Sequence, residues 1–304
     1  MHLRSKVSSS RRRYRAVEID ALRMPRDSRS PSKKPPAIAL WLVGLKAIVS
    51  PSNFCIPVQS SFRNPSLNHE FYDKHAARGW HAAGLPRTNV AMRLIAGLSV
   101  GDVLDVGCGE GESAVEIRKL TNATVRCVDV SQVAVQSTRN RGFDARQVDL
   151  NDEPLPFDDE SFDLVYLTEV IEHLVRPDRA LQEIRRVLRP AGHLVVSTPN
   201  LACLPNRVLL ALGLQPLFSE VSEDKVLGRG LRLLGQGTSP VGHLRLYTLR
   251  GLVETLRLHN FQPTVIRGAA FSDDRLGILQ RVIAQVPSLA MILVVRAQKE
   301  STKR

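Results

Sequence analysis

The residues best suited to chemistry in this 304-residue chain lie in one glycine-rich stretch, Val103-Leu104-Asp105-Val106-Gly107-Cys108-Gly109-Glu110-Gly111. An apolar strand runs into a turn with three glycines at alternate positions, and a helix is predicted to follow. Glycines let a backbone approach a ligand closely, and the N-terminus of the helix offers unpaired N–H groups. The spacing G-x-G-x-G differs from the dinucleotide fingerprint G-x-G-x-x-G, and no Lys-Ser/Thr follows as a P-loop requires.

Three acidic residues at the ends of predicted strands indicate which ligand the loop binds. Asp105 precedes the first glycine by two residues, where a carboxylate would repel a pyrophosphate and suits a cationic group. Asp129 ends the second strand, where it can accept hydrogen bonds from both ribose hydroxyls. Asp149 ends the third strand and can receive the amine of adenine. Taken singly, each is also a common turn residue, but together with the loop they predict a nucleoside site without phosphates.

Alternating strands and helices must position these residues. The apolar patterns predict a doubly covered parallel sheet of the α/β class. Strands are predicted at 102–106, 124–130, 145–150, 162–168, 193–198, 264–269 and 290–295, and helices at 112–120, 132–141, 177–188 and 249–258.

Several motifs in order carry a family resemblance. They are V-L-D-V-G-C-G-E-G at 103–111, V-D-V-S at 128–131, D-L at 149–150, L-P-F-D-D-E-S-F-D-L-V at 155–165, T-E-V-I-E-H-L at 168–174 and E-I-R-R-V-L-R-P-A-G-H-L at 183–194. Over roughly residues 70–297 the chain resembles the class I S-adenosylmethionine-dependent methyltransferases, in particular the small-molecule and ubiquinone-biosynthesis-like (type 11) enzymes. The resemblance implies a Rossmann-like, seven-stranded, mostly parallel sheet with helices on both faces and an antiparallel last strand.

The resemblance also implies a cofactor, S-adenosylmethionine, and a set of residues that bind it. The methionine part is expected at Asp105, Gly107, Gly109 and Gly111, the ribose at Asp129, the adenine at Asp149 and Leu150, and the reacting methyl near Thr168 and Glu169.

The expected enzyme reaction is an in-line displacement at the sulfonium methyl, in which the protein aligns the nucleophile and removes its proton. The candidate catalytic residues are His173, Glu169 and Glu172. In the alternative interpretation, Glu172 and His173 only cap the next turn.

The same segment suggests a metal site as a second alternative. Glu169, Glu172 and His173, with His243 about seventy residues later, are similar to the metal site of small-RNA 2′-O-methyltransferases. Two carboxylates and two imidazoles can hold Mg²⁺ or a transition ion that positions a hydroxyl. Because E-V-I-E-H-L also occurs in family members not known to need a metal, the sequence favours a site without one.

The charge distribution bears on the partner. The net charge is +12, but residues 1–50 hold 12 basic and 3 acidic side chains, residues 70–200 have a net charge of −5 and residues 201–304 a net charge of +7. The acidic centre disfavours a nucleic-acid partner. The sequence favours a small-molecule or lipid-linked acceptor, and the alternatives are an RNA-modifying methyltransferase, a nucleic-acid-binding protein that uses its basic tail, or a non-catalytic cofactor binder.

The acceptor is expected under an insertion at about residues 201–242. This segment is apolar at 208–214 and 231–234, and basic residues there suit a negatively charged acceptor: Arg207, Arg229, Arg232 and Arg245. Alternatively, the apolar run 208–212 caps the sheet.

The domain organisation is predicted from composition. Residues 1–69 form a basic N-terminal extension that is predicted to be disordered, and residues 70–304 form the methyltransferase domain, whose first helix is expected from Phe71 to Trp80. The apolar run at 37–49 is too short to span a membrane, which leaves contact with a membrane surface open. Four cysteines without CxxC pairing favour a reduced, cytoplasmic setting.

Overall fold

The computed structural model describes residues 72–73, 85–271 and 275–300, all of which belong to the unit Phe62–Arg304. The predictions for the N-terminal extension, including the apolar run at 37–49, lie outside these residues, as does most of the helix expected from Phe71 to Trp80. The boundary near residue 70 therefore stays a prediction. Among the described residues, no helix combines the length and apolarity that crossing a bilayer requires.

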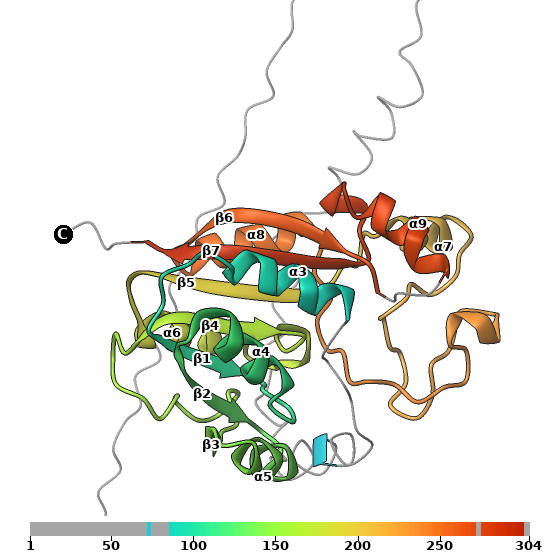
Figure 1. The fold of residues 1–304 in the computed structure, drawn as a ribbon. Coiled ribbons are helices and arrows are strands. Elements are labelled where there is room, and N and C mark those ends of the chain that lie inside the picture. The colour runs from blue at the N-terminus through green and yellow to red at the C-terminus, as the bar shows by residue number, and fades with distance from the viewer. Residues whose placement is uncertain (1–71, 74–84, 272–274, 301–304) are drawn as a thin grey trace, which may run out of the picture. The chain divides into compact units, whose positions relative to one another are not determined.

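A seven-stranded sheet forms the centre of the described fold (Figure 1). Its strands are in the order β3-β2-β1-β4-β5-β7-β6, and β7 alone runs antiparallel to its neighbours, β5 and β6. The strands are β1 (Asp102–Val106), β2 (Thr124–Asp129), β3 (Asp144–Gln147), β4 (Phe162–Thr168), β5 (Leu188–Pro199), β6 (Phe261–Ala269) and β7 (Ile292–Lys299). The predicted fold class, including the antiparallel last strand, is confirmed.

Helices cover both faces of the sheet, as the alternation in sequence predicts. In Figure 1, α3 and α4 lie in front of the sheet and α6 and α8 lie behind it. The helices are α3 (Pro86–Ile95), α4 (Glu112–Thr121), α5 (Gln132–Asn140), α6 (Pro177–Val187), α7 (Leu204–Ala211), α8 (Leu249–Leu258) and α9 (Arg275–Ile283). One core cluster joins α3, α4 and α5 to the sheet, and a second joins α6 and α8 to it.

Alternation along β1 explains how one strand serves both cores. Val103 belongs to the cluster under α3 and α4, whereas Leu104 and Val106 belong to the cluster under α6 and α8. Successive side chains of a strand point to opposite faces, so Asp105 shares the face of Val103. The sequence therefore places a carboxylate among the buried apolar residues of this strand.

Helix starts follow local side-chain chemistry. The hydroxyl of Ser131 accepts a hydrogen bond from the N–H of Ala134 at the start of α5, and that of Thr248 accepts one from the N–H of Gly251 at the start of α8. Helix α6 begins at Pro177, whose fixed φ suits the first helical position. These caps fix where each helix leaves the edge of the sheet.

Several strand boundaries differ from those predicted. The strand predicted at 264–269 begins earlier, at Phe261, and the strand predicted at 290–295 extends from Ile292 to Lys299. Two further differences have a local cause. The predicted strand 193–198 begins earlier, at Leu188, because a bulge lets Leu188 pair with Phe162 before His193 pairs with Leu164. The predicted strand 145–150 ends at Gln147. It ends there because the carbonyl of Asp149 accepts hydrogen bonds from the next turn, which places Asp149 beyond the strand.

The insertion between β5 and α8 contains a helix and a short turn of 3-10 helix, η3 (Arg232–Leu234). Buried Asn206 stabilises it, since its amide donates to the carbonyls of Leu201 and Leu217 and accepts from the N–H of Leu217. The apolar periodicity did not predict α7, nor α3 and α9 at the two ends of the described fold.

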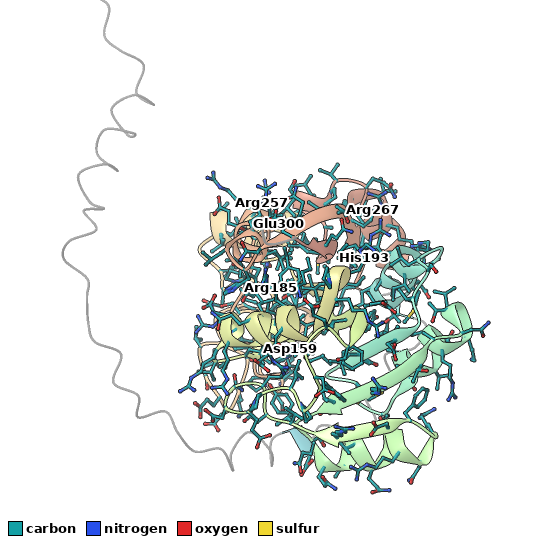
Figure 2. The ribbon with its side chains drawn as sticks, turned by 90° about the vertical axis from the view of Figure 1, so that its left-hand side faces the viewer. Asp159, Arg185, His193, Arg257, Arg267 and Glu300 are labelled. Atoms are coloured by element: carbon teal, nitrogen blue, oxygen red, sulfur yellow. The ribbon has the colours of Figure 1, made fainter. Side chains whose placement is uncertain are left out.

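The side of the molecule at which β7 ends carries charged side chains. Figure 2 shows Asp159, Arg185, Arg257 and Glu300 labelled there. Asp159 accepts a hydrogen bond from Arg186, which also donates to the carbonyls of Phe157 and Leu155. These contacts fasten the loop before β4 to α6.

Two leucines of α8 provide a test of the packing. Leu256 is fully buried against the sheet, whereas Leu258 is 73% exposed. Leu256→Ala is expected to lower the free energy of unfolding by about 2–5 kcal/mol, because a cavity remains. Leu258→Ala, the matched control, should change it by no more than about 0.5 kcal/mol. Urea unfolding of both variants measures the difference, and equal losses would contradict this packing.

Candidate functional site

The glycine loop has the left-handed backbone that its sequence predicts. The φ angles are +73° at Gly107, +52° at Gly109 and +81° at Gly111, which is the N-cap residue of α4. Side chains resist this region of backbone space. The loop therefore passes directly from the end of β1 to the first turn of α4.

The three glycines serve different purposes. A Cβ at Gly107 would lie 2.3 Å from Cγ2 of Val170, and one at Gly111 would lie 2.9 Å from Oγ1 of Thr138. Within the described part of the chain, a Cβ at Gly109 would meet no atom within 4 Å. The first and third glycines thus allow close packing, whereas the second borders open space that a ligand can occupy.

The carboxylate of Asp129 joins the glycine loop to α5. Its Oδ2 accepts a hydrogen bond from the N–H of Gly109 at 2.9 Å, and its Oδ1 accepts one from the N–H of Ser131 at 2.8 Å. Thr138 of α5 donates to the carbonyl of Gly109 at 2.8 Å. The N–H of Val130 also interacts with this carboxylate. A carboxylate has about four lone-pair sites, so Asp129 can still accept a hydrogen bond from the ribose, as predicted.

Asp105 is a buried carboxylate beneath this loop. Its side chain is 1% exposed, and Oδ2 has no hydrogen-bond partner in the described part of the chain. Burial, followed by the charge of Asp129, raises the pKa of Asp105 to about 8. A cationic amine would supply the missing partner, so these residues fit the amino-acid part of S-adenosylmethionine.

The residues predicted to contact adenine lie in the turn after β3. Asp149 is buried, and its Oδ1 accepts hydrogen bonds from the backbone N–H and the side-chain amide of Asn151, both at 2.9 Å. Leu150 belongs to the core cluster under α6. Asp149 therefore has a structural role in its turn, and its contact with adenine stays a prediction, as does that of Leu150.

The surroundings of Tyr72 indicate that acidic residues from different segments of the chain lie near one another. Burial is the largest cause that raises the pKa of Tyr72, and the charges of Glu172, Asp129 and Asp149 raise it further. The ring also makes an edge contact with His173, with centroids 5.8 Å apart. Tyr72 thus lies close both to the predicted cofactor residues and to the predicted catalytic segment.

Thr168 is the last residue of β4, and Glu169 follows it. The reacting methyl group is expected near these two residues. Thr168 pairs with Ser197 of β5. Glu169 has a φ of +56°; its Oε1 accepts a hydrogen bond from Ser197 at 2.7 Å, and its Oε2 lies 3.5 Å from Nε of Arg87. These contacts hold the Glu169 carboxylate between β5 and α3.

Glu172, His173 and His243 come together next to this strand. Each offers one possible metal-ligand atom, and the three atoms lie within 4.8 Å of one another. Glu172 is fully buried, and burial, followed by the charge of Glu169, raises its pKa. Glu169, the fourth member of the predicted metal alternative, is not part of this group.

The arginines expected to attract a charged acceptor mostly serve the fold. Arg207, Arg229 and Arg245 donate to backbone carbonyls, respectively those of Ala202, Leu234 and Val175. These contacts stabilise the insertion and its neighbours. Because the guanidinium groups keep their charge, their role in attracting a negatively charged acceptor stays a prediction.

The apolar residues of the insertion are largely exposed. Leu209 is buried, but Val208, Leu210 and Leu212 are exposed, and Leu233 is 88% exposed. Of the run 208–212, the burial of Leu209 agrees with the alternative that this run caps the sheet, and that alternative stays a prediction. The insertion presents apolar surface.

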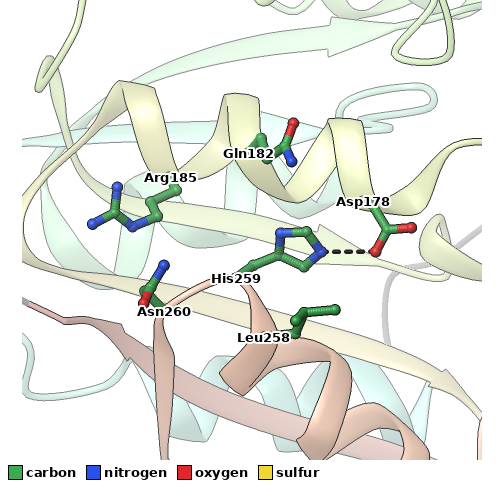
Figure 3. A pocket seen from close by; sticks show the side chains of 6 residues that line it. All are labelled: Asp178, Gln182, Arg185, Leu258, His259 and Asn260. Carbon is green, nitrogen blue, oxygen red and sulfur yellow. Dashed lines mark hydrogen bonds and ion pairs between the residues drawn. The ribbon is translucent and has the colours of Figure 1, made fainter.

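A separate pocket lies between α6 and the end of α8 (Figure 3). Its lining residues are Asp178, Gln182, Arg185, Leu258, His259 and Asn260. The ring of His259 points to Asp178, with Nε2 and Oδ1 2.7 Å apart. None of these residues belongs to the predicted site, which makes His259 a useful control histidine.

Sequence reasoning missed the side chains that support the site. Thr138 supports the glycine loop, Ser197 and Thr198 support the two glutamates, and Glu220 accepts three backbone N–H bonds from residues 241–243. One usable signal was the polar pair Ser197-Thr198, which directly follows the apolar residues Leu194, Val195 and Val196. Nothing local marks Glu220.

Comparison with known proteins connects this geometry to a family. Residues 104–196 match the family described as "Methyltransferase domain". Methyltransferase GfsG of Streptomyces halstedii is 40% identical over 101 residues, which are 31% of this chain and 36% of that protein. The 27-O-demethylrifamycin SV methyltransferase of Amycolatopsis mediterranei is 31% identical over 143 residues, 43% of this chain and 50% of that protein. The matches thus span half or less of these relatives.

A solved structure shares the fold. A chain of the complex between the Haloferax volcanii Trm112 methyltransferase activator and a methyltransferase superposes with a TM-score of 0.56 at 17% identity. The superposition covers 78% of this chain and 99% of that chain.

Two glycines allow a matched test of the ligand space. Gly97 and Gly109 both have positive φ and open surroundings, but only Gly109 lies in the loop. Alanine at either position should cost about 1–2 kcal/mol of stability. Only Gly109→Ala is expected to weaken S-adenosylmethionine binding, about tenfold or more, because its Cβ enters the ligand space. Calorimetry measures both affinities, and an unchanged affinity in Gly109→Ala would contradict this assignment. Gly107→Val is a poorer test, because its side chain would clash with Val170.

The raised pKa of Asp105 predicts a pH dependence. Because the folded chain holds this proton up to about pH 8, stability should fall as the pH rises from about 4 to 8. Affinity for the amino cation of S-adenosylhomocysteine should instead rise over pH 6–8, by at most about tenfold per pH unit. Calorimetry at several pH values tests this. Asp105→Asn should bind more weakly with a flatter profile, and an unchanged profile would show that Asp105 is not the titrating group.

Proposed function

Because the chain carries a class I S-adenosylmethionine-dependent methyltransferase domain, we propose that it transfers a methyl group to a hydroxyl oxygen of a small-molecule or lipid-linked acceptor. The observation that carries this proposal is the buried, unpartnered carboxylate oxygen of Asp105 beneath a glycine loop with open space at Gly109. A nucleoside ligand with a cationic amino acid attached satisfies both features.

The bound cofactor supplies an activated sulfonium methyl group. On the protein side, Asp105 binds the amino cation and Asp129 accepts hydrogen bonds from the ribose, while its contacts to Gly109 and Ser131 hold the loop in place. Fixing the ligand in one orientation lowers the entropic part of the barrier, because the methyl group then faces one direction. The residues at the end of β4 occupy that side.

The acceptor side contains the candidate proton acceptors. In the proposed step, an oxygen lone pair of the acceptor forms the new C–O bond, the C–S bond breaks, and its electron pair returns to sulfur. The hydroxyl proton passes to the group formed by Glu169, Glu172 and His173. The hydrogen bonds from Ser197 to Glu169 and from Thr198 to Glu172 support this assignment, because they fix the carboxylates next to the end of β4.

Two observations favour an apolar, small acceptor. The name of the rifamycin relative describes O-methylation of a small molecule, and the exposed leucines of the insertion, including Leu212 and Leu233, offer surface for an apolar acceptor. The acidic centre of the chain gives no support to an RNA acceptor.

The test measures S-adenosylhomocysteine production by the full chain with hydroxylated polyketides, quinols and glycolipids. We expect turnover with hydroxyl acceptors and not with RNA. His173→Ala should lower kcat about 10²-fold or more while leaving cofactor affinity unchanged. His259→Ala, a change in the separate pocket, should leave kcat unchanged. Tight cofactor binding without turnover on any acceptor would instead support a non-catalytic binder, and transfer to RNA alone would contradict the proposal.

A further inference from the structure

We propose that α7 and α9 form a docking surface for a bilayer that contains anionic phospholipids. The first part of this surface is a stripe of apolar side chains on α7. Leu204, Val208 and Leu212 follow one another at intervals of four residues along the helix and its C-cap, and they are 38 to 69% exposed. Because residues four apart share one face of a helix, these side chains form a single outward stripe.

The second part of the docking surface is a similar stripe on α9. Leu279, Val282 and Val286 are spaced three and four residues apart on the helix and the turn that follows it, and they are 49 to 66% exposed. An amphipathic helix of a globular protein normally turns its apolar stripe toward the core. In α7 and α9, a full apolar stripe is left outside the core.

The two stripes lie at the same end of the molecule. Figure 1 shows α7 and α9 there together, and the guanidinium group of Arg207 in α7 donates to the carbonyl of Ser288, two residues beyond Val286, at 3.1 Å. Single exposed leucines are ordinary on a protein surface. Exposed apolar residues that gather in one region instead mark a surface for a partner or a membrane.

The charges of the two helices indicate which partner this is. Helix α7 contains Arg207 and α9 contains Arg275 and Arg281, whereas neither helix sequence contains an acidic residue. Residues 201–304 as a whole have a net charge of +7. A helix that combines exposed apolar residues with arginines suits an anionic bilayer, whose headgroups attract the arginines and whose acyl chains accept the apolar residues. A second copy of this chain would bring like charges together.

A row of aromatic rings connects the docking surface to the acceptor side. The ring centroid of Phe271, an exposed residue four positions before α9, lies 5.5 Å from that of Phe218. The centroid of Phe218 lies 6.2 Å from that of His243, which lies 4.9 Å from that of His173. A lipid-linked acceptor held in the bilayer would therefore enter beside the predicted catalytic segment. This delivery of the acceptor rests on the proposed function, whereas binding to the bilayer does not.

The experiment measures co-sedimentation of the full chain with lipid vesicles. One set of vesicles contains phosphatidylcholine alone, and the other contains equal amounts of phosphatidylcholine and phosphatidylglycerol. We expect binding to the mixed vesicles that weakens as the salt concentration rises. Binding to phosphatidylcholine alone should be about tenfold weaker or more, because the arginines then lose their anionic headgroups.

Two double variants test the two stripes separately. Val208→Ser combined with Leu212→Ser changes α7, and Leu279→Ser combined with Val282→Ser changes α9. Each double variant should weaken binding to the mixed vesicles about tenfold or more, because less apolar surface then enters the acyl region.

A matched control removes two exposed leucines elsewhere. Leu120→Ser combined with Leu258→Ser changes the surfaces of α4 and α8, and both leucines are exposed. This control should leave vesicle binding unchanged. Circular dichroism and S-adenosylhomocysteine affinity verify that every variant folds.

The outcomes separate the docking surface from the proposed function. Failure to bind the mixed vesicles, equal binding to both kinds of vesicle, or binding that both stripe variants retain would overturn the docking surface. Dimerisation that the stripe variants abolish, in place of vesicle binding, would assign the stripes to a second copy and would also overturn it. Stripe variants that lose vesicle binding but still methylate a water-soluble hydroxyl acceptor would support both proposals. Stripe-dependent vesicle binding without methyl transfer to any acceptor would support the docking surface and count against the proposed function.

Discussion

Acidic side chains buried without cationic partners are the constraint on which this site depends. Asp105 and Glu172 each bury a carboxylate oxygen that has no hydrogen-bond partner in the described part of the chain. Burying such groups costs free energy unless a partner compensates. The fold bears this cost at the edge of the sheet where the parallel strands end, so ligands that bring positive charge or hydrogen-bond donors are favoured there.

The two halves of the site are built in different ways. The cofactor half comes from consecutive strand–turn–helix units, in which Asp129 fixes the glycine loop through backbone N–H groups. The acceptor half combines the turn after β4 with the far end of the insertion, and Glu220 and Phe218 orient His243. The first half relies on local geometry and the second on packing between distant segments.

The fold was predictable to the extent that its signals are local. The apolar pattern along the sequence predicted the bounds of β1, β2 and β4 to within one residue. Apolar residues at helical spacing predicted the bounds of α6 and α8 equally well. The start of β5 and the end of β3 were wrong because a bulge and a hydrogen-bonded turn decide them. The carbonyl contacts of the arginines in the insertion were not predicted for a related reason, since composition reveals a charge but not the group that it contacts.

The sequence by itself determined the glycine loop, its acidic neighbours, the order of strands and helices and the family resemblance, because each is encoded within one short segment. Only the tertiary structure decided that Gly109 borders open space while Gly107 and Gly111 pack against side chains. It also decided that His243 meets Glu172 and His173 while Glu169 turns to Ser197 and Arg87. The physical reason is that these contacts join residues far apart in the chain, whose distances depend on how the sheet, its helices and the insertion pack together.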